Sequence, residues 1–334
     1  MQTRRINLEN LRARGAEARL HEASAIISRG GLVAFPTETV YGLGANALDR
    51  DAVLKIFEAK QRPAWDPIIV HGNCLDMLRS IVREWPEKAD ALAAKFMPGP
   101  LTLLLSKRDI IPNECTAGRV KVGVRIPANP VALALISAAG TPIAAPSANR
   151  FGSTSPTTAA HVLRDLDGRI DAVLDGGECS VGVESTVLDP SLDPPVIYRP
   201  GGISRERIEA VIGPVKIAEK KLDPGRTPGS LESPGLGIRH YAPRAKVILV
   251  ESEAEMRRAS EGPRVGVMLP DGWTVGDSVI YEWGPMNQPE ILARRLYFGL
   301  RWLDEQGVTA IICPLPAPAG LGLAVRDRLL KAAM

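Results

Sequence analysis

The chain of 334 residues has few aromatic side chains and few cysteines. Phe, Trp and Tyr together make up 4% of the residues, which leaves little aromatic surface for stacking nucleic-acid bases. The cysteines lie far apart and form no CxxC pair, so the sequence encodes neither a zinc ribbon nor a redox dithiol. We expect reduced and mostly buried thiols at Cys74, Cys115, Cys179 and Cys313.

Several motifs that would identify a chemistry are also missing. The sequence has no GxxxxGK[ST], so a bound nucleotide is not held by a P-loop, and it has neither HExxH nor GxSxG, which weighs against zincin and α/β-hydrolase chemistry. The N-terminus has no apolar core of the signal-peptide type, and the longest apolar stretch is interrupted by Gly140 and Pro142. We therefore predict a cytoplasmic protein without a membrane anchor.

The overall composition is that of an ordinary globular protein. Hydrophobic residues make up 45% and charged residues 24%, with a formal net charge of +3. This mild basic excess allows a polyanionic ligand such as a nucleotide or RNA, but it does not indicate one. The length exceeds that of most single cores, so we expect two domains.

The spacing of apolar residues predicts a first domain over residues 15–213. Strand patterns such as LVAF, IIVHG and LTLLLS are mixed with helical patterns without strict alternation, which predicts an α/β domain with an α+β-like, open, mixed sheet. One helix is expected to begin after Asp49, a capping residue, and to end before Pro63. Lys60 and Arg62 would then lie at a helix end and in the loop after it.

The rest of the chain divides into a linker and a second domain. Residues 214–245 are rich in proline, glycine and charge and have no sustained period, which predicts a linker. Its HYAP end could also close over a site as a lid. Strands and helices alternate more clearly over residues 246–334, which predicts a small Rossmann-like α/β domain.

Polar stretches follow several of the predicted strands. FPTETVYGLG places hydroxyls after an apolar strand, and we expect Gly42 and Gly44 to be turn residues, because GLGANA lacks the acidic strand end of a dinucleotide site. In KQRPAWDPIIVH a lysine offers a point charge, an arginine a planar fork for phosphate oxygens, and His71 lies on the next strand. A solvated helix end with a satisfied histidine explains that stretch equally well.

Further strand ends carry basic or hydroxyl side chains. Arg125 lies inside the apolar strand VKVGVRIP, where an unpaired guanidinium would be costly. The loop APSANRFGSTSPT offers hydroxyls and backbone N–H groups, with Pro156 at an expected helix start. GVESTVLD contributes Glu184 and Ser185, and IYRPGG contributes Arg199. Each stretch is ordinary alone, but together they indicate a deep site for a polyanion.

In this order and at these spacings, the stretches resemble the threonylcarbamoyl-adenylate synthase family in its long form, a YrdC-like catalytic domain followed by a C-terminal accessory domain. The resemblance is carried by FPTETVYGLGANAL, KQRP with a following VH, MPGPLTLLL, VGVRIP, PSAN with SPT, GVESTVLD, YRPGGIS and SPG…RHYAP. It implies an open twisted sheet around a large, positively charged, concave cavity.

The resemblance also implies an activity and its site. The reaction uses L-threonine, bicarbonate and ATP, with Mg²⁺ carried by the ATP, and gives threonylcarbamoyl-AMP and pyrophosphate for the modification of a tRNA adenosine next to the anticodon. A downstream tRNA-modifying transferase complex would be the partner. Around L-threonine the resemblance places Thr39, His71, Arg125, the backbone at Ala145, and Ser185. Around ATP it places Lys60, Arg62, Asp66, Lys121, Ser147, Asn149, Ser155, Arg199 and Tyr241, with Lys60 and Arg62 as the catalytic cations.

Two positions depart from the family pattern, and other functions remain open. The family more often has Asn at the position of Asp66 and a small hydroxyl residue at that of Lys121, and an acid near phosphates could hold Mg²⁺ or repel them.

A non-enzymatic RNA-binding module that uses the basic cavity is the main alternative function, with weak RNA binding possible even for the enzyme. Carbamoyl transfer from carbamoyl phosphate is a second alternative function. The zinc-binding cysteine sets that accompany YrdC-like domains with that activity are missing here.

Overall fold

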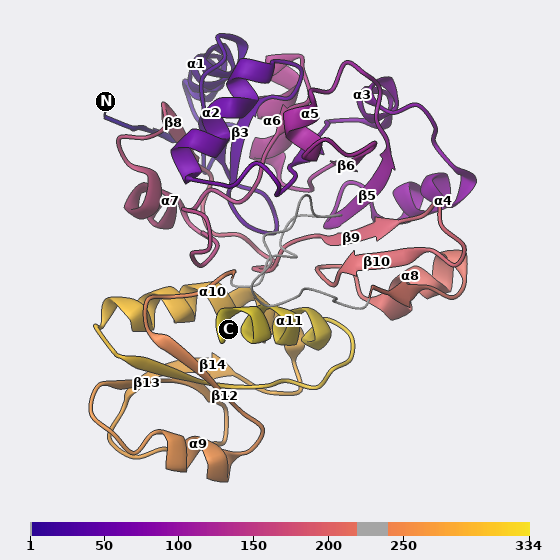
Figure 1. The fold of residues 1–334 in the computed structure, drawn as a ribbon. Helices are drawn as coiled ribbons and strands as arrows, with labels where there is room; N and C mark the ends of the chain where they lie inside the picture. The colour runs from indigo at the N-terminus through magenta and orange to yellow at the C-terminus, as the bar shows by residue number, and fades with distance from the viewer. Residues whose placement is uncertain (1, 219–239) are drawn as a thin grey trace.

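The computed structural model describes residues 2–218 and 240–334, and these form two β-sheets with helices packed on them (Figure 1). The larger sheet belongs to the N-terminal part of the chain and the smaller one to the C-terminal part. Helices α10 (Pro289–Glu305) and α11 (Gly322–Ala332) lie on the side of the small sheet that faces the large domain, and α9 (Glu253–Ala259) lies on the opposite side (Figure 1). The linker prediction over residues 219–239 falls outside the described residues.

The large sheet is mixed and open, as the sequence predicts. Its pairings alternate irregularly between parallel, as for β4 with β6, and antiparallel, as for β5 with β6. In spatial order the strands are β1 (Arg4–Asn7), β8 (Ala172–Asp175), β2 (Val33–Phe35), β3 (Gly42–Asn46), β7 (Ile143–Ala144), β4 (Ile69–His71), β6 (Lys121–Arg125), β5 (Leu101–Ser106), β9 (Thr186–Asp189), β10 (Val196–Arg199) and β11 (Lys216–Ile217).

Helices cover both faces of this sheet, which explains why its strands are apolar on both sides. Val33 and Phe35 belong to a core formed with α1 and α6, whereas Ala34 between them belongs to the core formed with α2 and α4. The helices of this domain are α1 (Ala16–Ser28), α2 (Arg50–Lys60), α3 (Leu75–Ile81), α4 (Glu87–Phe96), α5 (Asn113–Thr116), α6 (Pro130–Ala139), α7 (Ala159–Leu166) and α8 (Arg205–Ile212).

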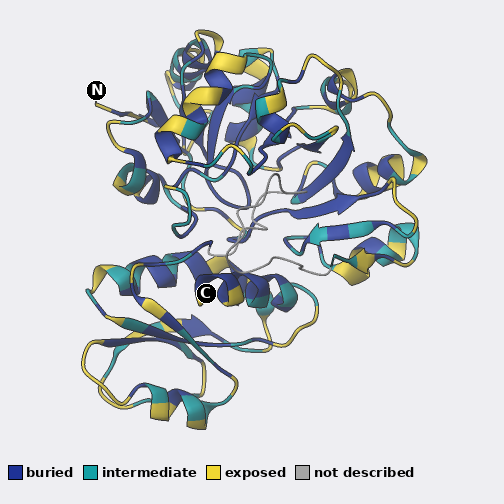
Figure 2. Cartoon of the chain, viewed as in Figure 1, coloured by how far each residue is buried: buried dark blue, intermediate teal, exposed yellow. Residues whose placement is uncertain are grey.

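The small sheet is fully parallel, so the prediction of a Rossmann-like C-terminal fold is confirmed. Its strand order is β12 (Lys246–Val250), β15 (Ala310–Pro314), β13 (Val265–Pro270) and β14 (Val279–Gly284). The helices are α9 (Glu253–Ala259), α10 (Pro289–Glu305) and α11 (Gly322–Ala332). Eight of the 17 residues of α10 and eight of the 11 of α11 are buried, whereas α9 buries only Met256 (Figure 2).

Two local predictions are wrong. Gly42 and Gly44 are strand residues of β3 and not turn residues, and a Cβ at Gly44 would come within 2.9 Å of Phe35 and Ile143 side-chain atoms. The glycines there allow close packing between the strand and its neighbours. The helix after the 145–157 loop begins at Ala159, with Thr158 as its cap, and not at Pro156.

Three smaller expectations can be compared with the structure. Asp49 caps α2 by accepting hydrogen bonds from the N–H groups of Asp51 and Ala52, as predicted. All four cysteines are free, and Cys74 alone of them is exposed. Within residues 2–218 and 240–334, none of the helices has the length and apolarity that a membrane crossing requires.

Candidate functional site

A buried cavity lies where several strands of the large sheet end. His71 is the last residue of β4 and Arg125 the last of β6, and the two are register partners in this parallel pair. Ala145 and Ser147 follow β7, and Arg199 ends β10. Because β7 runs antiparallel to β4, Ala145 lies beside Ile69 at the start of β4 and donates its N–H to the Ile69 carbonyl. The cavity therefore extends along the short central strands, where side chains far apart in the sequence converge.

The cavity brings together nine of the residues predicted for the site. These are Thr39, Arg62, His71, Arg125, Ala145, Ser147, Ser185, Arg199 and Tyr241. Among the residues that the structure describes, the lining also includes Thr37, Val40, Gly42, Ile69, Pro146, Glu184 and His240. The predicted residues that do not line it are Lys60, Asp66, Lys121, Asn149 and Ser155.

The threonine side of the predicted site is organised around Arg125. Its guanidinium pairs with Glu38 at 2.7 Å and donates to the hydroxyl of Thr39 at 3.1 Å and to the carbonyl of Gly99 at 3.1 Å. These contacts satisfy the buried guanidinium, as its position in an apolar strand requires. Glu38 neutralises part of the charge that a bound carboxylate would meet.

His71 is buried beside Arg125 and is neutral at physiological pH. Burial and then the positive charge of Arg125 lower the pKa of His71 to about 3. Its ring packs edge-on against Phe35, with centroids 6.2 Å apart. Nδ1 has no hydrogen-bond partner among the described residues. A neutral imidazole with a spare nitrogen can bind a small polar ligand without adding charge.

Arg62 and Asp66 form a buried ion pair behind the cavity. The distance between Arg62 Nη2 and Asp66 Oδ2 is 2.9 Å, and both side chains are almost fully buried. Arg62 also donates to the carbonyl oxygens of Asp66 and Pro67. Helix α2 ends at Lys60 and Gln61 adopts a left-handed conformation, so the chain turns before Pro63 and brings Arg62 to the cavity.

Lys60 binds the backbone of the PSAN segment. Its ammonium donates to the carbonyl oxygen of Ser147 at 2.6 Å and to that of Asn149. The side chain is fully buried, and burial, followed by the charge of Arg62, lowers its pKa well below the usual value. Lys60 therefore holds the segment that carries Ser147 and does not line the cavity itself.

Asn149 and Ser155 belong to the loop next to the cavity. Asn149 Nδ2 donates to the carbonyls of Arg150 and Ser153, which closes the loop on itself. The hydroxyl of Ser155 donates to Glu184 Oε1 at 2.7 Å. Their predicted contact with ATP stays a prediction.

Lys121 begins β6 and lies outside the cavity lining. Its ammonium pairs with Asp189 and lies 2.8 Å from the hydroxyl of Ser191. The Lys121 ammonium is therefore already paired with a carboxylate. The geometry adds no support to the predicted role of Lys121 at ATP.

Ser185 and Arg199 are fixed against each other at another part of the cavity. Arg199 donates to the Ser185 carbonyl at 3.0 Å and to its hydroxyl at 3.2 Å, and that hydroxyl lies 2.8 Å from the hydroxyl of Thr102. A Cβ at Gly201 would lie 2.4 Å from the carbonyl oxygen of Glu184. Glycine is therefore required there for the YRPGG turn to pack against this segment.

Glu184 lines the cavity, although the family resemblance assigns it no role at the site. Burial alone would raise its pKa, but Arg328 and Arg199 lower it to about 2. Tyr297 and Arg328, which belong to the C-terminal domain, both contact its carboxylate. In the sequence, the one indication that Glu184 belongs to the site is its position next to Ser185, a predicted site residue. Its partners lie more than a hundred residues away and cannot be inferred from that position.

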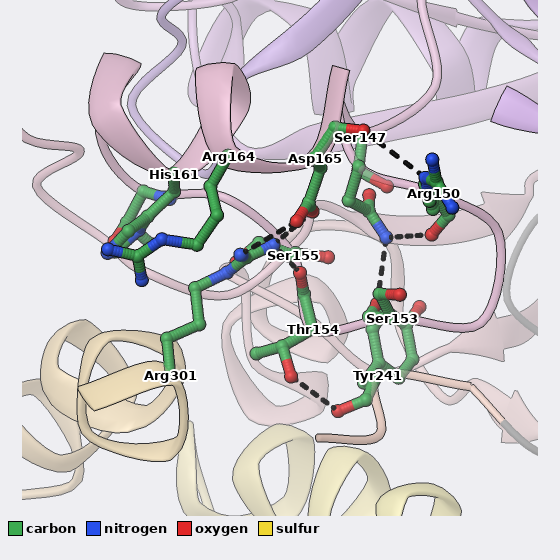
Figure 3. A network of polar contacts seen from close by, with 12 residues as sticks. Ser147, Arg150, Ser153, Thr154, Ser155, His161, Arg164, Asp165, Tyr241 and Arg301 are labelled. Atoms are coloured by element: carbon green, nitrogen blue, oxygen red, sulfur yellow. Dashed lines mark hydrogen bonds and ion pairs between the residues drawn. The ribbon is translucent and has the colours of Figure 1, made fainter. Parts of the chain in front are cut away.

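The described end of the linker reaches the cavity. His240 and Tyr241 are buried and line it. The Ala242 N–H donates to the Gly152 carbonyl at 2.9 Å, and the hydroxyl of Thr154 donates to the carbonyl of Tyr241 at 3.4 Å (Figure 3). Tyr241 has a φ of 65°, so its backbone is in the left-handed region. These contacts fasten the linker end to the loop that contains Ser155.

The cavity combines cations and neutral hydrogen-bonding groups. Arg62, Arg125 and Arg199 supply charge that suits carboxylate or phosphate oxygens, and Thr37, Thr39 and Ser185 supply hydroxyls. Among the residues that the structure describes, no three His, Cys, Asp or Glu side chains gather as a dedicated metal site would need. The arrangement fits a small anionic ligand.

Comparison with known proteins identifies the family of the chain. A family model described as "Telomere recombination" matches residues 25–201, and one described as "Threonylcarbamoyl-AMP synthase, C-terminal domain" matches residues 203–334. A threonylcarbamoyl-AMP synthase of Pyrococcus abyssi is 45% identical, with 97% of this chain and 96% of the relative covered. One of Bacillus subtilis is 44% identical, with 95% and 93% covered.

The solved structures give the same result. The crystal structure of P. abyssi Sua5 complexed with L-threonine has a TM-score of 0.91 at 43% identity, and the match covers 100% of this chain and 98% of that one. The fold and family predicted from the sequence are therefore confirmed. This chain belongs to the threonylcarbamoyl-AMP synthase family.

Proposed function

We propose that this chain is a nucleotidyltransferase that makes threonylcarbamoyl-AMP from L-threonine, bicarbonate and ATP, with release of pyrophosphate. The observation that carries the proposal is the convergence of Arg62, Arg125, Arg199, Ser185 and Thr39 on one buried cavity. The names of the P. abyssi and B. subtilis relatives support it. The product would pass to a tRNA-modifying transferase.

In the proposed complex, L-threonine lies beside Arg125. The guanidinium would bind the carboxylate of the amino acid, and neutral His71 would accept from a donor group of the ligand. Glu38, which already pairs with Arg125, would orient the guanidinium. The related P. abyssi Sua5 structure is complexed with L-threonine, which supports L-threonine as a substrate.

ATP is proposed to bind near Arg62, Arg199 and Ser147. The two guanidinium groups are the cations best placed for phosphate oxygens, because both line the cavity. Lys60 acts through the Ser147 and Asn149 backbone to which it is bonded. Mg²⁺ would enter with ATP, whose phosphates carry the oxygen ligands that the ion prefers.

The chemistry needs positioning more than a protein nucleophile. The threonine amine combines with bicarbonate to give a carbamate and water. A carbamate oxygen then forms a bond to the α-phosphorus of ATP while the bond from that phosphorus to the bridging oxygen breaks, and pyrophosphate leaves. Arginines that are already fixed by buried hydrogen bonds stabilise the developing charge with little reorganisation.

His240 and Tyr241 are proposed to shield the reactants from water. Both are buried at the cavity, and Tyr241 is anchored through its own carbonyl and through Ala242. Exclusion of water would protect a labile carbamate and a mixed anhydride. If deletion of residues 228–244 left turnover and product lifetime unchanged, the linker would be a tether only.

The direct test is pyrophosphate release from ATP by the purified full-length chain. Release should require both L-threonine and bicarbonate, and omission of either should abolish it. Release that continues without threonine would contradict the proposal.

The RNA-binding alternative is less well supported. The cavity is lined by buried side chains, which suits a small ligand better than a strand of RNA. Among the described residues of the lining, Tyr241 is the one Phe, Trp or Tyr, so successive bases would have little to stack on.

A further inference from the structure

We infer that helix α10 of the C-terminal domain is a positioning element for the nucleotide, and that Tyr297 and Arg301 hold the Ser155 loop in its binding conformation. The inference rests on the proposed function, because Ser155 is predicted to contact ATP. It gives the C-terminal domain a role in the site without any direct contact with substrate.

Tyr297 acts on the side chain of Ser155 through Glu184. The Tyr297 hydroxyl lies 3.0 Å and 2.9 Å from the two carboxylate oxygens of Glu184. Arg328 of α11 donates to Oε2 of the same carboxylate at 2.7 Å, and Ser155 donates to Oε1 at 2.7 Å. Glu184 therefore joins the C-terminal domain to the serine, and its orientation is set from the C-terminal side.

Arg301 acts on the backbone of the same loop. It lies one helical turn after Tyr297, so both side chains project from one face of α10. Its guanidinium donates to the carbonyl of Thr154, contacts that of Ser155 at 3.4 Å, and pairs with Asp165 of α7 at 2.6 Å (Figure 3). Figure 3 shows Arg301 reaching from the C-terminal domain into this loop. The loop is thus held through a side chain by Tyr297 and through its carbonyls by Arg301.

The two domains are in close contact at this helix. Gly182 has a φ of 80°, and a Cβ there would come within 2.4 Å of the Arg294 Cα atom and 2.5 Å of the Ala293 carbonyl oxygen. No side chain fits between that loop and α10. The helix is therefore placed by backbone contact, and its side chains meet Glu184 and the Ser155 loop at fixed distances.

The side chains that connect α10 and α11 to Glu184 and the Ser155 loop are buried, unlike those of an ordinary surface contact. Tyr297, Arg301, Arg328 and Glu184 are all buried, and the carboxylate would be costly to bury without its partners. By contrast, Arg294 on the same helix pairs with Glu178 at 3.4 Å, and both side chains are more than two-fifths exposed. Arg294 touches the large domain but not the Glu184 network, so it supplies a matched control.

The test compares Tyr297→Phe, Arg301→Gln and Arg294→Gln in the full-length protein. Calorimetry would measure binding of a non-hydrolysable ATP analogue with Mg²⁺ and, separately, of L-threonine. We expect Tyr297→Phe and Arg301→Gln to weaken analogue binding about tenfold. L-threonine binding should change less than about twofold, because Arg125 is held by Thr39, Gly99 and Glu38, none of which belongs to α10. Arg294→Gln should bind both ligands like the wild type.

A double-mutant cycle shows whether Tyr297 acts through Glu184. In a Glu184→Gln background, Tyr297→Phe should lose most of its effect on analogue binding. Hydrogen exchange of residues 150–157 should be faster in Tyr297→Phe than in Arg294→Gln, and the melting temperature of Tyr297→Phe identifies a loss of global folding. The phenylalanine variant keeps the ring, so it is expected to remain folded.

Three results would overturn the inference in different ways. If the wild type binds the analogue and Tyr297→Phe and Arg301→Gln bind it equally well, the positioning role is wrong while the proposed function stands. If the wild type neither binds the analogue nor releases pyrophosphate, the proposed function is wrong and the inference falls with it. Equal weakening of analogue and threonine binding would assign these residues to general stability only.

Discussion

Arg62 and Asp66 form an ion pair of 2.9 Å in which both side chains are almost fully buried. The sequence alone suggests that an acid at position 66 could hold Mg²⁺ or repel the phosphates. In the structure the carboxylate neutralises and orients Arg62 and does not line the cavity. The departure from the family pattern therefore has a structural explanation.

Asp66→Asn tests this pairing. Loss of the charged partner leaves Arg62 buried with less compensation, so we expect the free energy of unfolding to fall by about 3 kcal/mol. Arg205→Gln removes an exposed pair of the same spacing, with Glu209, and should cost less than about 1 kcal/mol. Urea unfolding measures both. Equal losses in the two variants would contradict a specific role for the buried pair.

Lys60→Ala and Arg62→Ala should impair catalysis for different reasons. Arg62→Ala removes a cation that lines the cavity, and we expect turnover to fall by about 100-fold or more. Lys60→Ala frees the Ser147 and Asn149 carbonyls and should lower activity to a similar degree by displacing the loop.

Lys55→Ala is the matched control for these variants. Lys55 lies on the same helix and also donates to a backbone carbonyl, that of Gly30, but it does not line the cavity. Initial rates of pyrophosphate release compare all three variants. Near wild-type rates in Arg62→Ala would remove Arg62 from the proposed mechanism.

His71 should bind threonine as a neutral group. Because burial and Arg125 lower its pKa to about 3, its charge does not change between about pH 6 and about pH 8. We expect His71→Ala to raise the KM for threonine about tenfold, with the same ratio to wild type throughout this range. His21→Ala, at an exposed position on α1, should match the wild type. A ratio that varied strongly with pH would show that His71 titrates there.

Glu184 should make the free energy of unfolding depend on pH in the acid range. Although burial opposes ionisation, Arg328 and Arg199 lower the Glu184 pKa from 4.5 to about 2. A carboxylate with a depressed folded-state pKa stabilises the protein above its unfolded pKa and loses this contribution as pH falls. The shift corresponds to about 3 kcal/mol, present above about pH 5 and lost by about pH 2.

Comparison of the wild type with Glu184→Gln separates the contribution of Glu184 to the pH dependence of stability from the contributions of other carboxylates. Urea unfolding at several pH values should show a smaller decline in the variant than in the wild type over the same range. Parallel declines in the two proteins would mean that Glu184 has no unusual pKa.

Local chemistry made much of the fold predictable. The cap at Asp49 and the proline after Arg62 fix the ends of α2, and the apolar pattern of the C-terminal part indicates a parallel sheet. The sequence predicts the glycines of β3 as turn residues, and this is wrong. They allow close packing by Phe35 and Ile143, and only the tertiary structure reveals that packing.

The candidate site was predictable to a similar degree. Strand ends with basic and hydroxyl side chains indicate a polyanion site, and nine of the named residues share the cavity. The sequence could not show that Lys60 binds carbonyl oxygens or that Lys121 pairs with Asp189, because both partners are distant in the chain. For the same reason it gave no role to Tyr297 and Arg301.

The most direct test follows isotopically labelled bicarbonate into the product. Wild-type protein, ATP with Mg²⁺, L-threonine and labelled bicarbonate would be mixed, and the nucleotides analysed at once by mass spectrometry. The proposed function predicts threonylcarbamoyl-AMP that carries the label, formed in equal amount to pyrophosphate and lost in Arg62→Ala. Unlabelled AMP and pyrophosphate, with no labelled adenylate at any time, would contradict it.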